Sequence, residues 1–303
     1  MNLLILGFDG LEYNLVNRWK LKSLQQSQYG RLTIPKECYK ETEDPLGNII
    51  YEPWTPFVWS SILTGKLPQE IGLSEANIKK WQNPLLQLAR TLSLKLKLNK
   101  RKLTRQFFEG RGTTFERFGL QKKHFNLAET SKAPTIFDKA RKPIAINVPM
   151  VQMTHGSFGD EKWELELEGK TINGMIKEAW TDFQRIRRRT LETIRTNSWD
   201  LLMSYVRFLD TIGELQYGRF LRMHKAYMAC NDYARIAKQL AGKQKYCLIL
   251  SDHGMKPMNN TRFGMHSNHA FYSFNARINP PPQTITDLYP RISEWIENSA
   301  QEA

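Results

Sequence analysis

The chain has 303 residues, of which 41% are hydrophobic, and this suits one large α/β domain or a core that carries a smaller insertion. A mean hydropathy of −0.52 and the lack of any apolar run of about 18 residues argue against a transmembrane helix. The first residues do not have the pattern of a signal peptide, and the three widely spaced cysteines fit reduced thiols. We therefore expect a cytoplasmic protein without a disulfide framework.

The net charge of +14 is concentrated in one stretch of the chain. Between Lys79 and Lys142 there are seventeen Lys and Arg residues and only four Asp and Glu residues, so this stretch alone carries +13. Such a local basic field attracts polyanions or anionic substrates. We expect residues 76–142 to form a basic insertion, or cap, over a core made of residues 1–75 and 143–303.

The first predicted element is a fully buried strand over Leu3–Phe8, which is followed at once by Asp9 and Gly10. In an open α/β sheet, ligands bind at the carboxyl ends of the strands, so Asp9 is a candidate metal ligand. An Asp-Gly pair is also typical of a simple turn. These residues alone leave both interpretations open.

A helix over Leu11–Gln26, a strand over Gly30–Ile34 and a loop over residues 36–53 follow. The prolines Pro53 and Pro56 then predict a loop that leads into a helix over Phe57–Leu63, ending near Gly65. Thr55 lies at the start of this helix. It is either an N-cap or a nucleophile whose alkoxide a metal stabilises.

The second half of the chain alternates strands and helices. We predict strands over Ile144–Val148, Trp199–Phe208 and Lys245–Leu250, and helices over Ile172–Arg195, Glu214–Leu240 and Thr284–Asn298. Strands that alternate with helices favour an α/β fold with a mainly parallel central sheet and helices on both faces.

Acidic residues follow three of the predicted strands, namely Asp9, Asp210 and Asp252, and His253, His266 and His269 follow the third. Parallel strands bring these ends to one edge of the sheet. Three carboxylates without cations between them would repel strongly, whereas divalent metals would remove the repulsion. Mixed Asp and His ligands suit zinc, with manganese as an alternative.

Several stretches resemble the alkaline phosphatase superfamily, in particular its phosphodiesterase/nucleotide pyrophosphatase branch. LILGFDG resembles the opening strand and first metal-binding aspartate, and LILSDHGM is the most specific match. Thr55, nine residues before Thr64-Gly65, resembles the nucleophile region, and FLDTIGE resembles the Asp-x-x-Gly-His metal motif. INVPM (Ile146–Met150) and ITDLYPRI (Ile285–Ile292) resemble a core strand and the closing segment.

The resemblance implies an alkaline phosphatase-like fold with two divalent metal ions, zinc or manganese, at a phosphodiesterase site. One ion would be held by Asp9, Asp252 and His253, with Thr55 beside it as the catalytic nucleophile and a further ligand. The second ion would be held by Asp210, Glu214 and His266. Thr55 would attack phosphorus, and water would then hydrolyse a phospho-threonine intermediate.

Two positions depart from the family pattern. Glu214 stands where the family has His, so the second site would be weaker, prefer manganese, or use His269 instead. Val58 stands where nucleotide pyrophosphatases carry Asn, which makes nucleotide specificity an open question. Trp54 and Trp59 flank Thr55 and, with Val58 and His269, are candidate substrate contacts, although aromatic residues near a loop commonly serve as core or lid packing.

Three functional hypotheses remain open. The first, which we prefer, is a phosphodiesterase or pyrophosphatase acting on a nucleotide-like or other small phosphodiester. The second is a nucleic-acid-binding protein on a degenerate hydrolase core, with nucleic acid or another polyanion held by the basic insertion. The third is an enzyme whose insertion docks on an anionic membrane. The enzyme is favoured because all six of the residues Asp9, Thr55, Asp210, Asp252, His253 and His266 are present.

Overall fold

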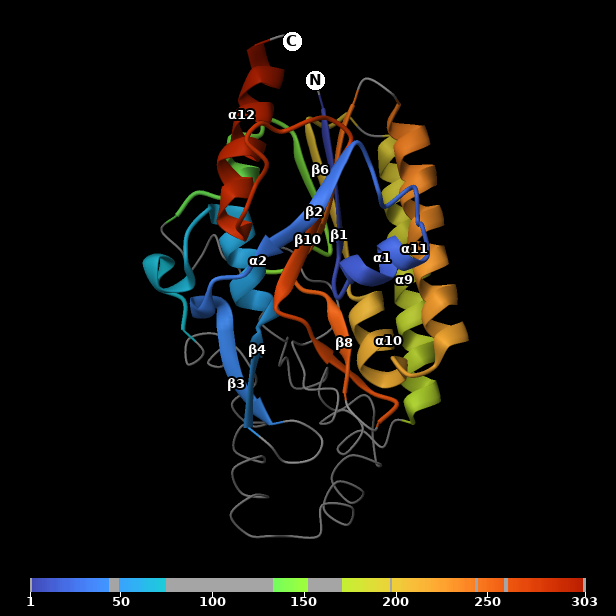
Figure 1. Cartoon of the computed structure of the whole chain (residues 1–303). Coiled ribbons are helices and arrows are strands. Elements are labelled where there is room, and N and C mark those ends of the chain that lie inside the picture. The colour runs from blue at the N-terminus through green and yellow to red at the C-terminus, as the bar shows by residue number, and fades with distance from the viewer. Residues whose placement is uncertain are drawn as a thin grey trace, which may run out of the picture.

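The computed structural model describes residues 2–43, 49–74, 133–151, 171–196, 198–242, 245–258 and 261–301. Its main feature is a six-stranded sheet in the order β2-β10-β7-β1-β6-β5 (Figure 1). The strands of this sheet, in chain order, are β1 (Leu3–Phe8), β2 (Gln28–Thr33), β5 (Pro143–Ile146), β6 (Leu201–Val206), β7 (Tyr246–Ser251) and β10 (His269–Phe274). β10 is antiparallel to both of its neighbours, β2 and β7, and thus runs opposite to the other five strands of this sheet. The predicted mainly parallel α/β fold is therefore confirmed.

Helices cover both faces of the sheet (Figure 1). On one face α2 (Thr55–Thr64) and α12 (Leu288–Gln301) pack with Leu3 and Ile5 of β1 in one apolar cluster. On the other face α9 (Ile172–Thr196), α10 (Phe208–Gln216) and α11 (Phe220–Ala241) pack with Leu4, Leu6 and Phe8. Because successive side chains of a strand point to opposite faces, β1 contributes to both clusters and is buried throughout.

The position of β1 at the centre of the sheet places its end between two other strand ends. Leu3 pairs with Leu201 of β6 and with Tyr246 of β7, and both pairings are parallel. The three strands therefore end at nearly the same level. The residues that follow them, including Asp9 and Asp252, meet at the carboxyl edge of the sheet.

The predicted helix over Leu11–Gln26 is wrong in length, since the structure has only α1 (Tyr13–Arg18). Lys20, just after it, has a left-handed φ of 50°, which does not continue a helix. The predicted loop over residues 36–53 is also corrected. It contains the 3-10 turn Lys36–Cys38 and the antiparallel strands β3 (Tyr39–Glu43) and β4 (Ile49–Pro53).

The predicted strand over Trp199–Phe208 ends at Val206, and the predicted helix over Glu214–Leu240 is two helices, α10 and α11. Asp210 therefore lies in the first turn of α10, not at a strand end. The helical conformation is interrupted by a break at Gly218, whose N–H donates to Arg262 O at 3.0 Å. A Cβ at this position would lie 3.1 Å from Arg262 Cα, so the loop that contains Arg262 passes close to the break.

Several short elements complete the described chain. They are the two-stranded pair β8 (Met255–Pro257) and β9 (Gly264–His266), and the 3-10 turns Pro68–Ile71, Ile136–Lys139 and Ile285–Asp287, the last of which precedes α12. The predicted basic insertion lies mostly in residues 75–132, outside the described residues. Within its described end, Ile136 is fully buried in the cluster of α2 and α12.

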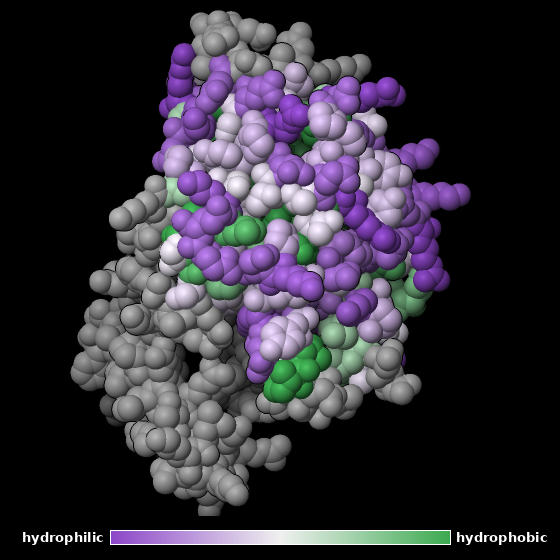
Figure 2. Space-filling model, turned by 60° about the vertical axis from the view of Figure 1, so that its left-hand side comes forward, coloured by the Kyte–Doolittle hydropathy of each residue, from purple (hydrophilic) through white to green (hydrophobic). Residues whose placement is uncertain are grey.

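The described surface is mainly polar. On the face seen in Figure 2, hydrophilic side chains predominate among the coloured residues, and hydrophobic ones form small separate patches. The most exposed large apolar side chains of the described residues are Leu221, Tyr51 and Ile49. Scattered exposed apolar residues of this kind are normal in folded proteins. Among the described helices, none is long and apolar enough to cross a bilayer.

Candidate metal centre

Two groups of potential metal ligands share one histidine at the carboxyl edge of the sheet. In one group, ligand atoms of Asp9, Asp252 and His253 all lie within 4.8 Å of one another. In the other, ligand atoms of Asp210, His253 and His266 do so. The sequence hypothesis had assigned these five residues to two neighbouring metal ions, and the fold brings all five together.

Asp9 is held at the end of β1 by its neighbours in the sheet. Its N–H donates to Val206 O at 3.0 Å, and its Oδ2 accepts a short hydrogen bond from the Tyr205 hydroxyl. Gly10 follows with a left-handed φ of 73°. A Cβ at Gly10 would lie 2.8 Å from Asp210 Cα, so only glycine lets this turn contact the start of α10. The turn thereby places Asp9 beside Asp210.

Asp252 and His253 occupy the turn that follows β7, and hydrogen bonds fix this turn. The Ser251 hydroxyl accepts from Leu11 N–H at 2.9 Å and donates to His253 O at 2.6 Å. His253 Nδ1 donates to Gly254 O at 3.1 Å, because a carbonyl oxygen can only accept. The Nε2 atom of the ring therefore faces the carboxylates, 3.1 Å from Asp9 Oδ1 and 3.6 Å from Asp252 Oδ2.

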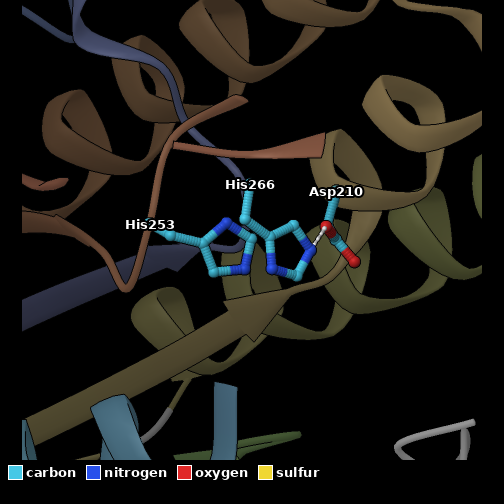
Figure 3. A group of neighbouring side chains, drawn as sticks. All are labelled: Asp210, His253 and His266. Carbon is cyan, nitrogen blue, oxygen red and sulfur yellow. Dashed lines mark ion pairs between the residues drawn. The ribbon is translucent and has the colours of Figure 1, made fainter. Parts of the chain in front are cut away.

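The second group is built from α10 and β9. His266 Nε2 lies 3.2 Å from Asp210 Oδ1, and Figure 3 shows this ion pair with His253 alongside. Glu214, one turn further along α10, brings its Oε1 to 3.3 Å from the same nitrogen. His266 Nδ1 donates to Pro53 O at 3.1 Å, which leaves Nε2 for the carboxylates. The carboxylate of Glu214 thus reaches the same His266 nitrogen as the carboxylate of Asp210.

The centre has buried oxygen atoms that lack hydrogen bonds. Among the described residues, Asp9 Oδ1, Asp210 Oδ1 and both carboxylate oxygens of Asp252 are buried and without a hydrogen-bond partner, as is His266 Nε2. Buried polar atoms are normally satisfied, so such a cluster calls for another partner. Oxygen and imidazole nitrogen donors fit a divalent cation such as zinc or manganese.

The charges in the centre perturb one another strongly. Burial, and next the charge of Asp9, raise the pKa of Asp252 well above its usual range. Burial disfavours a charged His253, but the neighbouring carboxylates, Asp252 first, outweigh it and raise the pKa of that imidazole to about 9. Both shifts express an excess of negative charge that protons or metal cations can neutralise.

Thr55 is the first residue of α2, and its side chain points at the first group. Its Oγ1 lies 3.4 Å from His253 Nε2, and the residue is 9% exposed. The N-cap of the helix is Trp54, which makes no side-chain capping bond, so the N-cap interpretation of Thr55 is corrected. The predicted helix over Phe57–Leu63 ends near Gly65 as expected, but it begins two residues earlier, at Thr55.

The predicted substrate contacts do not all reach the centre. Val58 and Trp59 are fully buried, and the ring of Trp59 packs edge-on against Tyr205. They belong to the core, which was the alternative interpretation of Trp59. Trp54 is 8% exposed, packs edge-on against Phe57 and lies under the ammonium group of Lys40 at 5.2 Å.

His269 and Glu214, the two candidates for the last ligand of the second ion, differ in their contacts. His269 Nε2 is 3.2 Å from Glu12 Oε1, whereas Glu214 Oε1 is 3.3 Å from His266 Nε2. Glu214 is therefore the candidate in contact with a proposed ligand. Sequence reasoning missed Glu12, Ser251 and Tyr205, which hold the ligands in place. Their only signal was proximity to the motifs, because each of them has a partner more than 190 residues away.

Comparisons with known proteins give a distant structural likeness. No family model matches the sequence, and no curated protein matches it. Among solved structures, the chain is similar to murine ectonucleotide pyrophosphatase/phosphodiesterase 5, with a TM-score of 0.42 and 11% sequence identity. The match covers 86% of this chain and 59% of that one, so the chain spans less than two thirds of the length of this neighbour. A likeness of this size assigns neither an activity nor a substrate to the chain.

Proposed function

We propose that this chain is a two-metal phosphodiesterase or pyrophosphatase that hydrolyses a nucleotide-like or other small phosphodiester through a phospho-threonine intermediate at Thr55. The observation that carries the proposal is the position of the Thr55 hydroxyl, 3.4 Å from His253 Nε2. It lies beside a cluster of buried carboxylate oxygens that lack hydrogen-bond partners among the described residues. A hydroxyl group and a metal-binding cluster in contact are the two parts that such a reaction needs.

The ligands divide between two ions of zinc or manganese. Asp9, Asp252, His253 and Thr55 would hold the first, and Asp210, Glu214 and His266 the second. Such ions supply positive charge for the attacking and leaving oxygens of an in-line displacement and favour the alkoxide form of a coordinated hydroxyl. The Nδ1 contacts of both histidines to carbonyl oxygens are the second-shell bonds that fix the tautomer needed for binding through Nε2.

In the proposed reaction Thr55 Oγ1 forms a bond to phosphorus while the bond from phosphorus to the leaving oxygen breaks. Water then attacks the phospho-threonine, which releases a phosphomonoester and restores the threonine hydroxyl. Thr55 begins the ten-residue helix α2, so the positive end of the helix dipole faces the reacting phosphate. The helix therefore favours the negative charge that collects there.

The alternative of a nucleic-acid-binding protein on a degenerate core depends on the basic insertion, which lies largely outside the described residues. The intact geometry of the metal centre supports the enzyme. A decayed site would have no need to keep Thr55 in contact with His253 or to keep three buried carboxylates together at a cost in folding free energy.

The test is an assay of bis-p-nitrophenyl phosphate and p-nitrophenyl phosphate hydrolysis with zinc or manganese. Thr55→Val removes the hydroxyl and keeps the shape, and we expect it to lower diester turnover by on the order of 10³-fold or more. Thr55→Ser should keep part of the activity. Thr64→Val makes the same chemical change at the other end of α2, where the hydroxyl donates to Ser60 O and accepts from Lys66 N–H, and should leave turnover intact.

Two results would overturn the proposal. One is a Thr55→Val variant with the turnover of the unmutated protein. The other is an unmutated protein that binds less than one metal ion per chain and hydrolyses neither substrate with either metal.

A further inference from the structure

We propose that Glu12 is a positioning residue, which locks the two histidine-bearing turns of the metal centre onto the turn that carries Asp9. The inference rests on the proposed function for its catalytic meaning, but the contacts that carry it are independent of that function. Glu12 is 1% exposed, lies three residues after Asp9, and belongs to neither ligand group.

The buried carboxylate of Glu12 accepts hydrogen bonds from three segments of the chain. Oε2 accepts from Met255 N–H at 3.1 Å and from the Ser267 hydroxyl at 3.0 Å. Oε1 accepts from Asn14 N–H at 2.9 Å and lies 3.2 Å from His269 Nε2. One side chain thus joins the start of α1, the turn after β7 and the turn between β9 and β10.

The hydrogen bond from Met255 N–H to Glu12 Oε2 holds the turn of Asp252 and His253 in place. Met255 is two residues after His253, and Gly254 lies between them. A Cβ at Gly254 would collide with Glu12 Oε2 and lie 2.6 Å from Ser267 Oγ. Glycine is therefore required at this position so that the turn can approach the carboxylate. Gly254 O also accepts from His253 Nδ1, so the position of this turn helps to fix the orientation of the imidazole.

The other bonds fix the turn that follows His266. Ser267 and His269 both contact Glu12, and the two turns are also joined directly. Gly254 N–H donates to His269 O at 3.0 Å, and Ser267 N–H donates to Gly254 O at 2.9 Å. The Glu12 side chain therefore sets the positions of His253 and His266 relative to each other and to Asp9.

The chemistry of the site requires a carboxylate at this position. Four donors converge on Glu12, and an ionised carboxylate only accepts. Glutamine has the same shape, but its amide NH₂ would face at least one of these donors and lose that bond. Burial would raise the pKa of Glu12, yet its pKa is lowered, because His269 and the Asn14 N–H stabilise the ionised form.

The experiment compares Glu12→Gln with the unmutated protein by calorimetric titration of Mn²⁺ and Zn²⁺ and by NMR of the histidine rings in EDTA. Second-shell substitutions typically weaken metal binding by about 10–100-fold, and we expect that loss for Glu12→Gln. We also expect the His253 and His266 ring resonances to shift in EDTA. Ser267→Ala removes only one of the four donors and therefore disturbs the fold less than Glu12→Gln. It should produce the same changes to a smaller extent.

Leu24→Ala is the control for a purely structural effect, because Leu24 is fully buried in the cluster of α9 and α11 and is not one of the four donors to Glu12 described above. It should lower Tm while metal affinity and histidine resonances stay unchanged. Folded Glu12→Gln or Ser267→Ala with unshifted His253 and His266 resonances and unchanged metal affinity would overturn the role of Glu12. Shifted resonances in a protein whose unmutated form hydrolyses no diester would support that role and refute the proposed function alone.

Discussion

The imidazole rings of His253 and His266 are stacked, with their centroids 3.8 Å apart and their planes inclined by 19°. The two residues come from different turns, and each donates its Nδ1 hydrogen to a backbone carbonyl, Gly254 O and Pro53 O. Both Nε2 atoms are thereby directed at carboxylates. The stacking makes the two ligand groups neighbours, and His253 has a ligand atom close to both.

This arrangement predicts unequal effects for the two histidines on metal content. His266→Asn should remove one ion per chain, because it deletes a ligand of the second group only. His253→Asn should remove the first ion and also weaken the second, because its ring belongs to both groups. Metal analysis by mass spectrometry after gel filtration measures the stoichiometry.

His224→Asn is the matched control, since that ring stacks on Phe220 of the same helix, α11, and packs edge-on against Trp19, and the metal content should be unchanged. If His253→Asn and His266→Asn each lost one ion and left the other affinity unaltered, the two groups would be independent, contrary to this prediction.

Much of the site was predictable from sequence because its signals are local. Asp9-Gly10 and Asp252-His253 each follow a run of apolar residues, and the parallel strands β1 and β7 pair directly, so the two motifs had to meet. Thr55 was predictable because proline and glycine mark both ends of α2.

Other features depended on long-range contacts. Asp210 follows an apolar run that continues to Leu209, and the sequence does not show that the strand ends at Val206 and that α10 begins at Phe208. Glu12 has no local feature that distinguishes it from a surface acid. Its role comes from donors at Met255, Ser267 and His269, which tertiary structure alone brings to it.

Glu214 should determine which metal the second group prefers. Its Oε1 is 3.3 Å from His266 Nε2, and its side chain is 29% exposed. Glu214→His replaces a hard oxygen donor with imidazole, so we expect the ratio of zinc to manganese affinity at the second site to rise. Glu214→Ala should lose the second ion and keep the first. Competition titrations between Mn²⁺ and Zn²⁺ measure the ratio, and an unchanged ratio in Glu214→His would exclude Glu214 as a ligand.

The three cysteines should be unreactive in the folded protein. Burial raises the pKa of Cys38 to about 11 and that of Cys247 to about 12, and it raises the pKa of Cys230 as well. Because the folded pKa values lie above those of the unfolded chain, the thiols contribute to stability below the unfolded value, and this contribution is lost as pH rises through the folded values. Ellman's reagent at pH 8 should label no thiol until denaturant is added, and then three. Unfolding by urea should become easier above about pH 9. Rapid labelling of the native protein would contradict the buried positions.

Gly10 should be more sensitive to substitution than a glycine of the same backbone conformation elsewhere. Gly10 and Gly72 have nearly equal left-handed φ angles of 73° and 72°. A Cβ at Gly72 would have no neighbour within 4 Å, whereas one at Gly10 would lie 2.8 Å from both Cα and N of Asp210. Gly72→Ala should therefore cost only the backbone strain, about 1 kcal/mol in the free energy of unfolding. Gly10→Ala should cost a further 1–3 kcal/mol, roughly, for the steric overlap.

The steric overlap in Gly10→Ala should also disturb the metal centre. Moving the first turn of α10 away from Gly10 carries Asp210 away from His266, so Gly10→Ala should weaken the second metal ion, and Gly72→Ala should not. Urea unfolding and Mn²⁺ titration of both variants distinguish the backbone strain, which both variants share, from the steric overlap, which only Gly10→Ala creates. Equal losses of stability in the two variants, with unchanged metal affinity, would show that the contact between Gly10 and Asp210 does not position the site.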